Sequence, residues 1–296
     1  MKIVADENIA YVKDIFAPLG LIECIPGRPM TCGALKEADV LLVRSVTRVD
    51  ADLLEGSAVR FVGTCTIGTD HIDLDYLKKR GIAFADAVGS NANSVAEYVL
   101  TAILVLARQK GWDLNGKTLG IIGVGNIGSI IEKKAPALGL KVLPNDPPLH
   151  RKTADPRFVS LDQALQADII SLHVPLTASG PDPTFHLLNE NNLPRLKPHT
   201  VLINTSRGPV VDNNALKNCL TARTIGPTVL DVWENEPNID QQLLDLVAIG
   251  TAHVAGYSLD GKANGAAMLH AAVCDFFNLT GKTNIAALLP TRPLAI

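Results

Sequence analysis

Paired cysteines are missing from this chain of 296 residues. The five cysteines are scattered and none forms a CxxC motif: Cys24, Cys32, Cys65, Cys219 and Cys274. An odd number of dispersed cysteines disfavours both a disulfide framework and a cysteine-based zinc site. We therefore expect reduced thiols, as in a cytoplasmic protein.

An excess of positive charge and long apolar runs are also absent. The sequence has 27 Lys and Arg residues against 30 Asp and Glu residues, so no basic field attracts nucleic acid or anionic lipid. The longest apolar run, Val99–Ala107, is far shorter than the roughly 20 residues of a transmembrane helix. Met1 leads almost directly into a strand-like segment, so we expect no signal peptide. Nucleic-acid and membrane partners are therefore not expected.

The HExxH motif of metalloproteases and the GxSxG motif of serine hydrolases do not occur. The remaining histidines show no spacing that indicates metal ligands, so we expect no metal site. What the chain does contain is abundant apolar surface, with 47% hydrophobic residues and a mean hydropathy of +0.20. This composition is typical of a well-filled globular core.

Short apolar runs alternate with helical patterns along nearly the whole chain. Strands are expected at Ile3–Ala5, Val40–Val43, Phe61–Thr64, Leu119–Val124, Lys141–Leu143, Asp168–Val174, Val201–Asn204, Val229–Val232 and Ile249–Ala252. Helices are expected at Tyr11–Pro18, Ala51–Leu54, Leu74–Lys79, Ala92–Arg108 and Asn264–Asn278. Such alternation predicts an α/β protein with doubly wound parallel sheets.

A glycine-rich turn, "GIIGVGNIG", joins one expected strand to a helical pattern. Its GxGxxG glycines are Gly123, Gly125 and Gly128, and Asp146 ends the next strand 23 residues after the first of them. Glycines let the backbone approach a pyrophosphate, while a carboxylate at that distance accepts hydrogen bonds from an adenosine ribose. No lysine or arginine stands beside Asp146, which favours NAD over NADP. The alternative is a tight turn followed by a surface aspartate.

Three ionisable residues follow three successive strands: Arg207, Glu236 and His253. The carboxyl ends of parallel strands line the ligand-binding edge of a doubly wound sheet, so these side chains can converge. They suit hydride transfer from a secondary alcohol beside a carboxylate: histidine accepts the hydroxyl proton, glutamate orients the ring and arginine grips the carboxylate. The alternatives are a surface ion pair, a solvated loop charge and a core histidine.

Motifs along essentially the whole chain resemble those of the D-isomer-specific 2-hydroxyacid dehydrogenases: "GTDHIDLDYLKKRGI", "GSNANSVAEYV", "GIIGVGNIG", "LHVPL", "INTSRGPVVD", "LDVWENEP" and "TAHVAGYS". The resemblance implies a Rossmann NAD domain inserted into a flavodoxin-like substrate domain. The substrate domain is then expected at residues 1–92 and 254–296, and the NAD domain at 93–253.

Other strings resemble one subgroup of that family: "KIVADENI", "IPGRPM", "LLVRSVTRVD", "NDPP" and "AGYSLDGKANG". This resemblance implies NAD-dependent oxidation of 4-phospho-D-erythronate to 2-oxo-3-hydroxy-4-phosphobutanoate, a step of one bacterial route to pyridoxal 5′-phosphate, by a homodimer. Oxidation or reduction of another small D-2-hydroxy acid, and NAD(H) sensing without catalysis, are the alternatives. The subgroup usually continues into a small C-terminal dimerisation domain that this sequence lacks, so we expect either a truncated chain or a short relative.

The resemblance also assigns roles to individual residues. Arg207, Glu236 and His253 are implied to be catalytic. The implied cofactor contacts are Gly123, Gly125, Asn126, Ile127, Gly128, Asp146, Val174, Thr205, Ser206, Arg207, Asp231 and Gly256. The implied substrate contacts are Ser45, Thr66 and Tyr257; we add Arg44, because a cation beside hydroxyl groups suits a terminal phosphate.

Overall fold

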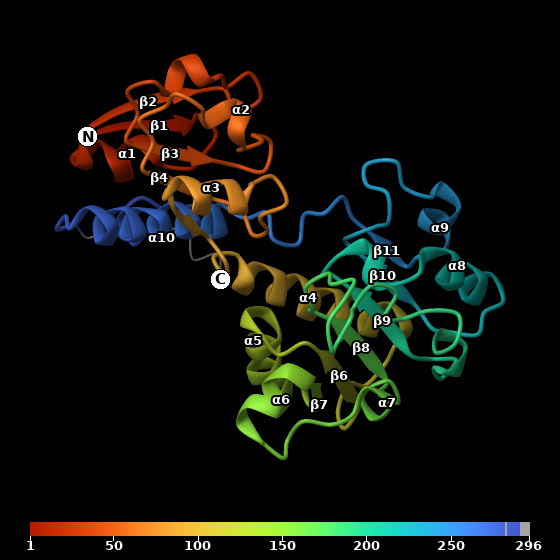
Figure 1. Ribbon diagram of the computed structural model, residues 1–296. Coiled ribbons are helices and arrows are strands. Elements are labelled where there is room, and N and C mark those ends of the chain that lie inside the picture. Colours follow the sequence, from red (N-terminus) through yellow and green to blue (C-terminus); the bar gives the residue numbers. More distant parts are fainter. Residues whose placement is uncertain (282, 291–296) are drawn as a thin grey trace. The chain divides into compact units, whose positions relative to one another are not determined.

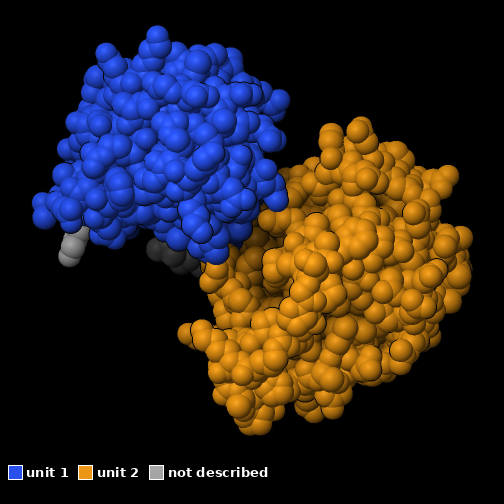
Figure 2. All heavy atoms as spheres, viewed as in Figure 1, with its two compact units in different colours: residues 1–91, 257–296 blue, residues 92–256 orange. Residues whose placement is uncertain are grey.

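The computed structural model describes residues 1–281 and 283–290, which form two compact units. Unit 1 combines residues 1–91 with the chain from Tyr257 onward, and unit 2 comprises residues 92–256 (Figure 2). Each unit contains one parallel β-sheet, of five strands in unit 1 and six in unit 2, which confirms the predicted fold class. Among the described residues, no helix has both the length and the apolar character needed to cross a membrane.

Unit 1 has the strand order β2-β1-β3-β4-β5, the flavodoxin-like order (Figure 1). Its strands are β1 (Lys2–Asp6), β2 (Leu21–Ile25), β3 (Val40–Val43), β4 (Phe61–Thr64) and β5 (Ala83–Asp86). Its α-helices are α1 (Val12–Phe16), α2 (Ala51–Leu54), α3 (Leu74–Arg80) and α10 (Leu259–Phe277). Strands β2 and β5 were not predicted; both are edge strands whose side chains are only partly buried, so neither shows a strong apolar run.

Alternation of side chains along the strands of unit 1 builds two core layers. Val4 and Leu41 face the layer under α2 and α3. Ile3 and Leu42 face the opposite layer, with α1 and α10. Successive strand residues point to opposite faces, so a sheet covered on both sides needs apolar residues at nearly every position. The C-terminal helix α10 thus completes a core that the N-terminal strands begin.

Unit 2 has the strand order β11-β10-β9-β8-β6-β7. Its strands are β6 (Thr118–Ile122), β7 (Lys141–Asn145), β8 (Ile169–Leu172), β9 (Val201–Asn204), β10 (Thr228–Leu230) and β11 (Ile249–Gly250). Its α-helices are α4 (Ala92–Lys110), α5 (Asn126–Lys134), α6 (Pro147–Thr153), α7 (Leu161–Ala164), α8 (Asn213–Thr221) and α9 (Gln241–Leu246). The chain order reverses between β6 and β8, and such a reversal marks the ligand-binding edge of an open α/β sheet. Pro144 lies in the edge strand β7, where proline is tolerated.

Several strands of unit 2 end earlier than the sequence indicates. β6 stops at Ile122 and β10 at Leu230, two residues before the expected ends, and β11 comprises only Ile249–Gly250. After β6 and β10 the apolar pattern continues because residues such as Val124 and Val232 remain buried in turns, whereas the residues directly after β11 are exposed or partly exposed. Those turns carry the predicted site residues.

Candidate active site

The three glycines of the GxGxxG turn answer to different constraints. Gly123 has a φ of 90°, and a Cβ there would lie 2.6 Å from the carbonyl oxygen of His173. A Cβ on Gly128 would lie 2.1 Å from the carbonyl oxygen of Gly123. A Cβ on Gly125 would meet no protein atom within 4 Å, although this residue is the N-cap of α5. Packing therefore explains two of the glycines, and the third leaves open space where a pyrophosphate can approach the N-terminus of a helix.

This difference predicts opposite outcomes for two alanine substitutions. We expect Gly128→Ala to lower the free energy of unfolding by about 2 kcal/mol or more, because the added methyl group overlaps a backbone oxygen. Gly125→Ala should leave thermal unfolding unchanged and raise the Kd for NAD about tenfold, which is about 1.4 kcal/mol. Calorimetry of unfolding and NAD titration would measure both effects. Equal loss of stability in the two variants would contradict this assignment.

Asp146 lies beside the glycine turn. One of its carboxylate oxygens accepts a hydrogen bond of 2.9 Å from the Val124 backbone N–H, and the other accepts one of 2.9 Å from Leu149 N–H at the start of α6. Each carboxylate oxygen can accept a further hydrogen bond. The aspartate is thus held at the turn with capacity left for the hydroxyl groups of a ribose.

The turns after β8 and β9 contain Val174, Thr205 and Ser206, of which Thr205 and Ser206 are buried. Ser206 Oγ donates to Asn204 Oδ1 at 2.8 Å, and Thr205 Oγ1 lies 3.4 Å from His173 Nδ1. Burial lowers the pKa of His173 to about 3, so its ring is neutral at physiological pH. His173 and Val174 lie next to the glycine turn, because a Cβ on Gly123 would touch the His173 carbonyl group and a Val174 methyl group.

Asp231 organises the turn that contains His253. Its buried carboxylate accepts hydrogen bonds from Thr251 Oγ1 at 2.6 Å and from the backbone N–H groups of Val254 and Ala255 at 2.8 and 2.9 Å. These donors hold His253 in a left-handed backbone conformation with a φ of 55°. The structure gives Asp231 a positioning role, which the sequence did not reveal; direct contact between Asp231 or Gly256 and a cofactor stays a prediction.

Glu236 and His253 form a hydrogen-bonded pair. The distance from Glu236 Oε2 to His253 Nδ1 is 2.9 Å, and the other glutamate oxygen accepts from Trp233 N–H at 2.7 Å. The His253 side chain is half exposed, at 51%, and its Nε2 has no hydrogen-bond partner among the described residues. A carboxylate that holds Nδ1 in this way leaves Nε2 directed outward for proton transfer.

A cavity of about 320 Å³ lies beside the Glu236–His253 pair. It is lined by the following residues: Trp233, Glu236, Pro237, Ile239, Leu244, Gly250, Thr251, Ala252 and His253. Most of this lining is apolar, and the Glu236 carboxylate, the His253 imidazole and Thr251 are its polar side chains.

Arg207 follows β9 and lies in the same unit as the pair. Its Nη1 donates to the carbonyl oxygen of Ser206 at 2.8 Å, and its own carbonyl oxygen accepts from Asn204 Nδ2 at 3.0 Å. Within the described residues it has no hydrogen bond or ion pair to Glu236 or His253. In the structure, Glu236 and His253 are thus in direct contact, whereas Arg207 lies at a separate position on the same edge of the sheet.

Three of the predicted substrate residues of unit 1, Arg44, Ser45 and Thr66, follow β3 and β4, while Tyr257 lies just before α10. Arg44 Nε donates to the buried carboxylate of Asp6 at 3.1 Å, and Ser45 next to it is exposed. Thr66 lies 2.8 Å from Thr64 through their hydroxyl oxygens. Since β3 and β4 are neighbours, their carboxyl ends present these groups at one edge.

Lys262 is a further member of this group that the sequence reasoning missed. Lys262 lies in the first turns of α10, and its Nζ is 3.4 Å from the centroid of the exposed Tyr257 ring. The Lys262 ammonium, and to a smaller extent the Arg44 guanidinium, lower the pKa of the Tyr257 hydroxyl. The string "AGYSLDGKANG" contained the signal, a lysine five residues after the tyrosine.

Comparison with known sequences identifies the family to which unit 2 belongs. Residues 93–255 match the family described as D-isomer specific 2-hydroxyacid dehydrogenase, NAD binding domain. The chain is 49% identical over 291 residues to an erythronate-4-phosphate dehydrogenase of Chromohalobacter salexigens and 50% identical over 296 residues to one of Pseudomonas entomophila. These alignments cover 98% and 100% of this chain, and 76% and 77% of the two relatives.

Among solved structures, the chain resembles D-lactate dehydrogenase from Aquifex aeolicus complexed with NAD and lactic acid. The TM-score is 0.73 at 28% sequence identity, and the match covers 94% of this chain and 96% of that one. D-2-hydroxyisocaproate dehydrogenase shares the fold, with a TM-score of 0.79 at 23% identity. The chain therefore belongs to the D-isomer-specific 2-hydroxyacid dehydrogenases, which are NAD-dependent enzymes, and within them to the group of the erythronate-4-phosphate dehydrogenases.

Proposed function

We propose that this chain oxidises 4-phospho-D-erythronate to 2-oxo-3-hydroxy-4-phosphobutanoate. The structural observation that carries this proposal is the Glu236–His253 hydrogen bond of 2.9 Å, which leaves His253 Nε2 for a substrate proton. The identity of about 50% to enzymes named for this substrate supports the choice of acid. Unit 1 is then the substrate domain and unit 2 the NAD domain.

The residues of unit 2 fit NAD and the chemistry of a 2-hydroxy acid. The open face of Gly125, the N-terminus of α5 and the Asp146 carboxylate would hold the cofactor, which accepts a hydride when bound. His253 Nε2 accepts the proton of the C2 hydroxyl group while Glu236 holds the ring through Nδ1. The guanidinium of Arg207 binds the substrate carboxylate by paired, charge-assisted hydrogen bonds. In the reverse direction the same imidazole returns the proton to the keto oxygen.

The residues of unit 1 suit a terminal phosphate. Lys262 supplies a cation at the Tyr257 ring and Arg44 supplies a second cation after β3, while Ser45 and Thr66 add hydroxyl donors. Phosphate oxygens accept strong hydrogen bonds from all of these groups. A substrate that has a carboxylate at one end and no charged group at the other end would leave Arg44 and Lys262 without an anionic ligand.

A substrate panel tests the proposed function. We expect rapid NADH formation with 4-phospho-D-erythronate, and slower formation by at least about 10²-fold in kcat/KM with D-erythronate, D-lactate and D-glycerate. Absorbance at the NADH band would follow each reaction. Equal rates with and without the phosphate would show instead a dehydrogenase of another small D-2-hydroxy acid. NAD binding without turnover of any acid would leave only a sensing role.

We also propose, from the resemblance alone, a cytoplasmic homodimer. Sedimentation of the purified chain would test the oligomeric state, and a monomer would overturn that part of the proposal.

A further inference from the structure

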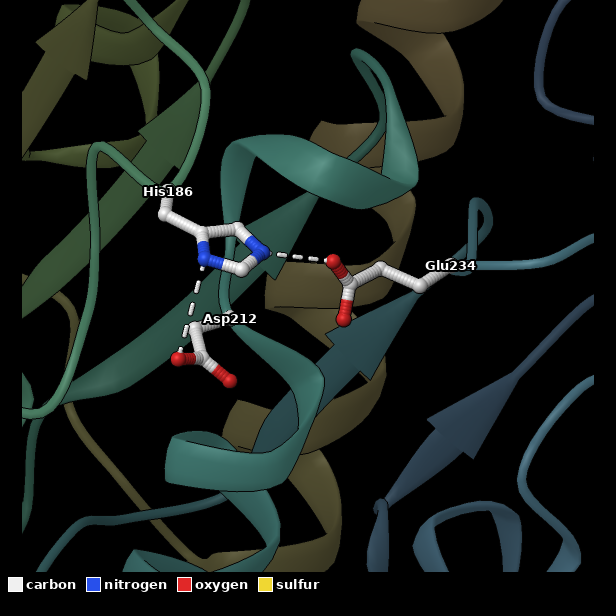
Figure 3. A group of neighbouring side chains, drawn as sticks. All are labelled: His186, Asp212 and Glu234. Atoms are coloured by element: carbon white, nitrogen blue, oxygen red, sulfur yellow. Dashed lines mark hydrogen bonds and ion pairs between the residues drawn. The ribbon is translucent and has the colours of Figure 1, made fainter.

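A histidine outside the proposed site holds two carboxylates of unit 2 together. His186 Nε2 lies 2.6 Å from Glu234 Oε1, and its Nδ1 lies 3.7 Å from Asp212 Oδ2 (Figure 3). The side chains are 30%, 17% and 23% exposed in the order His186, Glu234 and Asp212. This group, the His186 clasp, was not predicted from the sequence.

The clasp joins three loops, two of which carry proposed catalytic residues. Asp212 follows the turn of Arg207, and Glu234 lies two residues before Glu236. The backbone N–H of His186 donates to the carbonyl oxygen of Pro209 at 2.8 Å, which ties the histidine to the Arg207 turn as well.

Further contacts bind the same loops to one another. Glu234 Oε2 accepts from Asn213 N–H at 3.0 Å, and Asn213 Oδ1 accepts from Glu234 N–H at 3.2 Å. A Cβ on Gly208 would lie 1.9 Å from the carbonyl oxygen of Trp233, so the two turns touch without space for a side chain. A displacement of Glu234 is therefore transmitted to both turns.

The arrangement fits a clasp formed by protein side chains alone better than a metal centre. One ligand atom from each residue lies within 4.8 Å of the others, as a metal site requires. However, the two imidazole nitrogens face different carboxylates, Nε2 that of Glu234 and Nδ1 that of Asp212 (Figure 3). A metal ion binds only one of these nitrogens. Bound to Nε2, it would displace the hydrogen bond to Glu234; bound to Nδ1, it would leave Glu234 as the hydrogen-bond partner of Nε2 and not as a third ligand.

We propose that His186 is a positioning residue: by bridging Asp212 and Glu234 it fixes the loops that carry the Arg207 guanidinium and the Glu236 carboxylate. This inference rests on the proposed roles of Arg207 and Glu236. Loss of the bridge frees Glu234, and small displacements of reacting groups lower the rate of the chemical step without removing any substrate contact.

The test compares His186→Ala and His186→Gln with wild type. We expect kcat to fall about tenfold in His186→Ala while the Kd for NAD stays unchanged, with an intermediate kcat for His186→Gln, whose amide can still donate to Glu234. The isotope effect on kcat with substrate deuterated at C2 should rise, because the chemical step becomes slower. A general loss of stability would not produce this rise in the folded fraction.

His199→Ala is the matched control. His199 Nε2 lies 3.6 Å from Asp168 Oδ1 in the same unit, the side chain is 62% exposed, and among the described residues it has no hydrogen bond or ion pair with the three loops. We expect wild-type kcat and isotope effect for this variant.

Separate outcomes decide the separate claims. Unchanged kcat and isotope effect in both His186 variants would overturn the proposal, whichever 2-hydroxy acid the wild type oxidises. If the wild type rejects 4-phospho-D-erythronate but oxidises another acid, only the proposed substrate is wrong and the comparison proceeds on that acid. Whichever acid is the substrate, the proposal also requires that amide hydrogen exchange in residues 207–213 and 232–237 is faster in His186→Ala than in wild type. If Zn²⁺ raised the stability of the wild type but not of His186→Ala, His186, Asp212 and Glu234 would form a metal site, and the proposed clasp would be wrong.

Discussion

Replacement of His253 by glutamine is expected to lower kcat about 10³-fold while the Kd for NAD stays within a factor of two. General acid–base catalysis by a positioned side chain contributes roughly 10²- to 10⁴-fold, and glutamine cannot accept and release a proton near neutral pH. The substitution leaves the turn intact, because Asp231 bonds to backbone N–H groups after position 253 and not to the imidazole. Steady-state NADH formation and nucleotide titration measure the two quantities.

Glu236→Gln provides the partner measurement. A glutamine amide can still accept from Trp233 N–H, but it holds His253 Nδ1 less firmly than a carboxylate does. We expect a smaller loss of kcat than in His253→Gln. The double variant should lose no more than His253→Gln alone, since the glutamate acts through the ring. Additive losses would show that Glu236 has a role independent of His253.

His199→Gln controls for the general effect of losing a histidine beside a carboxylate, since it is 62% exposed beside Asp168. Wild-type kcat is expected. If His253→Gln also retains more than about a tenth of wild-type kcat, another group accepts the proton and the assignment of the base is wrong.

The interior strands could be predicted from the sequence because burial on both faces imposes apolar residues. β3 (Val40–Val43), β4 (Phe61–Thr64) and β9 (Val201–Asn204) have the predicted bounds, and every residue in them is buried. The edge strands β2 and β5 escaped prediction because solvent replaces part of their packing. Periodicity thus reports burial more directly than it reports hydrogen bonding between strands.

The site residues that lie directly after strands could be predicted from the sequence. Glu236 and His253 come after neighbouring strands, so topology alone suggested the contact that the structure contains. Asp231 and His186 could not be assigned in this way. Their roles depend on which side chain accepts which N–H across a turn, and sequence spacing does not determine that.

Phosphate recognition is expected to depend on Lys262 more clearly than on Arg44. Substitution of Arg44 would leave the fully buried Asp6 carboxylate without its ion-pair partner, which costs about 3 kcal/mol or more in stability. A loss of activity in Arg44→Met would therefore mix unfolding with lost binding. Lys262 has no ion pair among the described residues, and it covers the exposed Tyr257 ring, which a methionine side chain can still cover.

We expect Lys262→Met to lower kcat/KM for 4-phospho-D-erythronate about 10²-fold, since a hydrogen bond to a charged partner contributes up to about 3 kcal/mol. The low kcat/KM for D-erythronate should not change, because this substrate has no phosphate group for the Lys262 ammonium to bind. Lys78→Met, an exposed lysine on α3 of the same unit, should change neither value. The ratio of the two kcat/KM values is the decisive quantity, because it cancels any loss of folded enzyme. An equal fall for both substrates would place Lys262 outside phosphate recognition and leave that role to Arg44 and the hydroxyl groups.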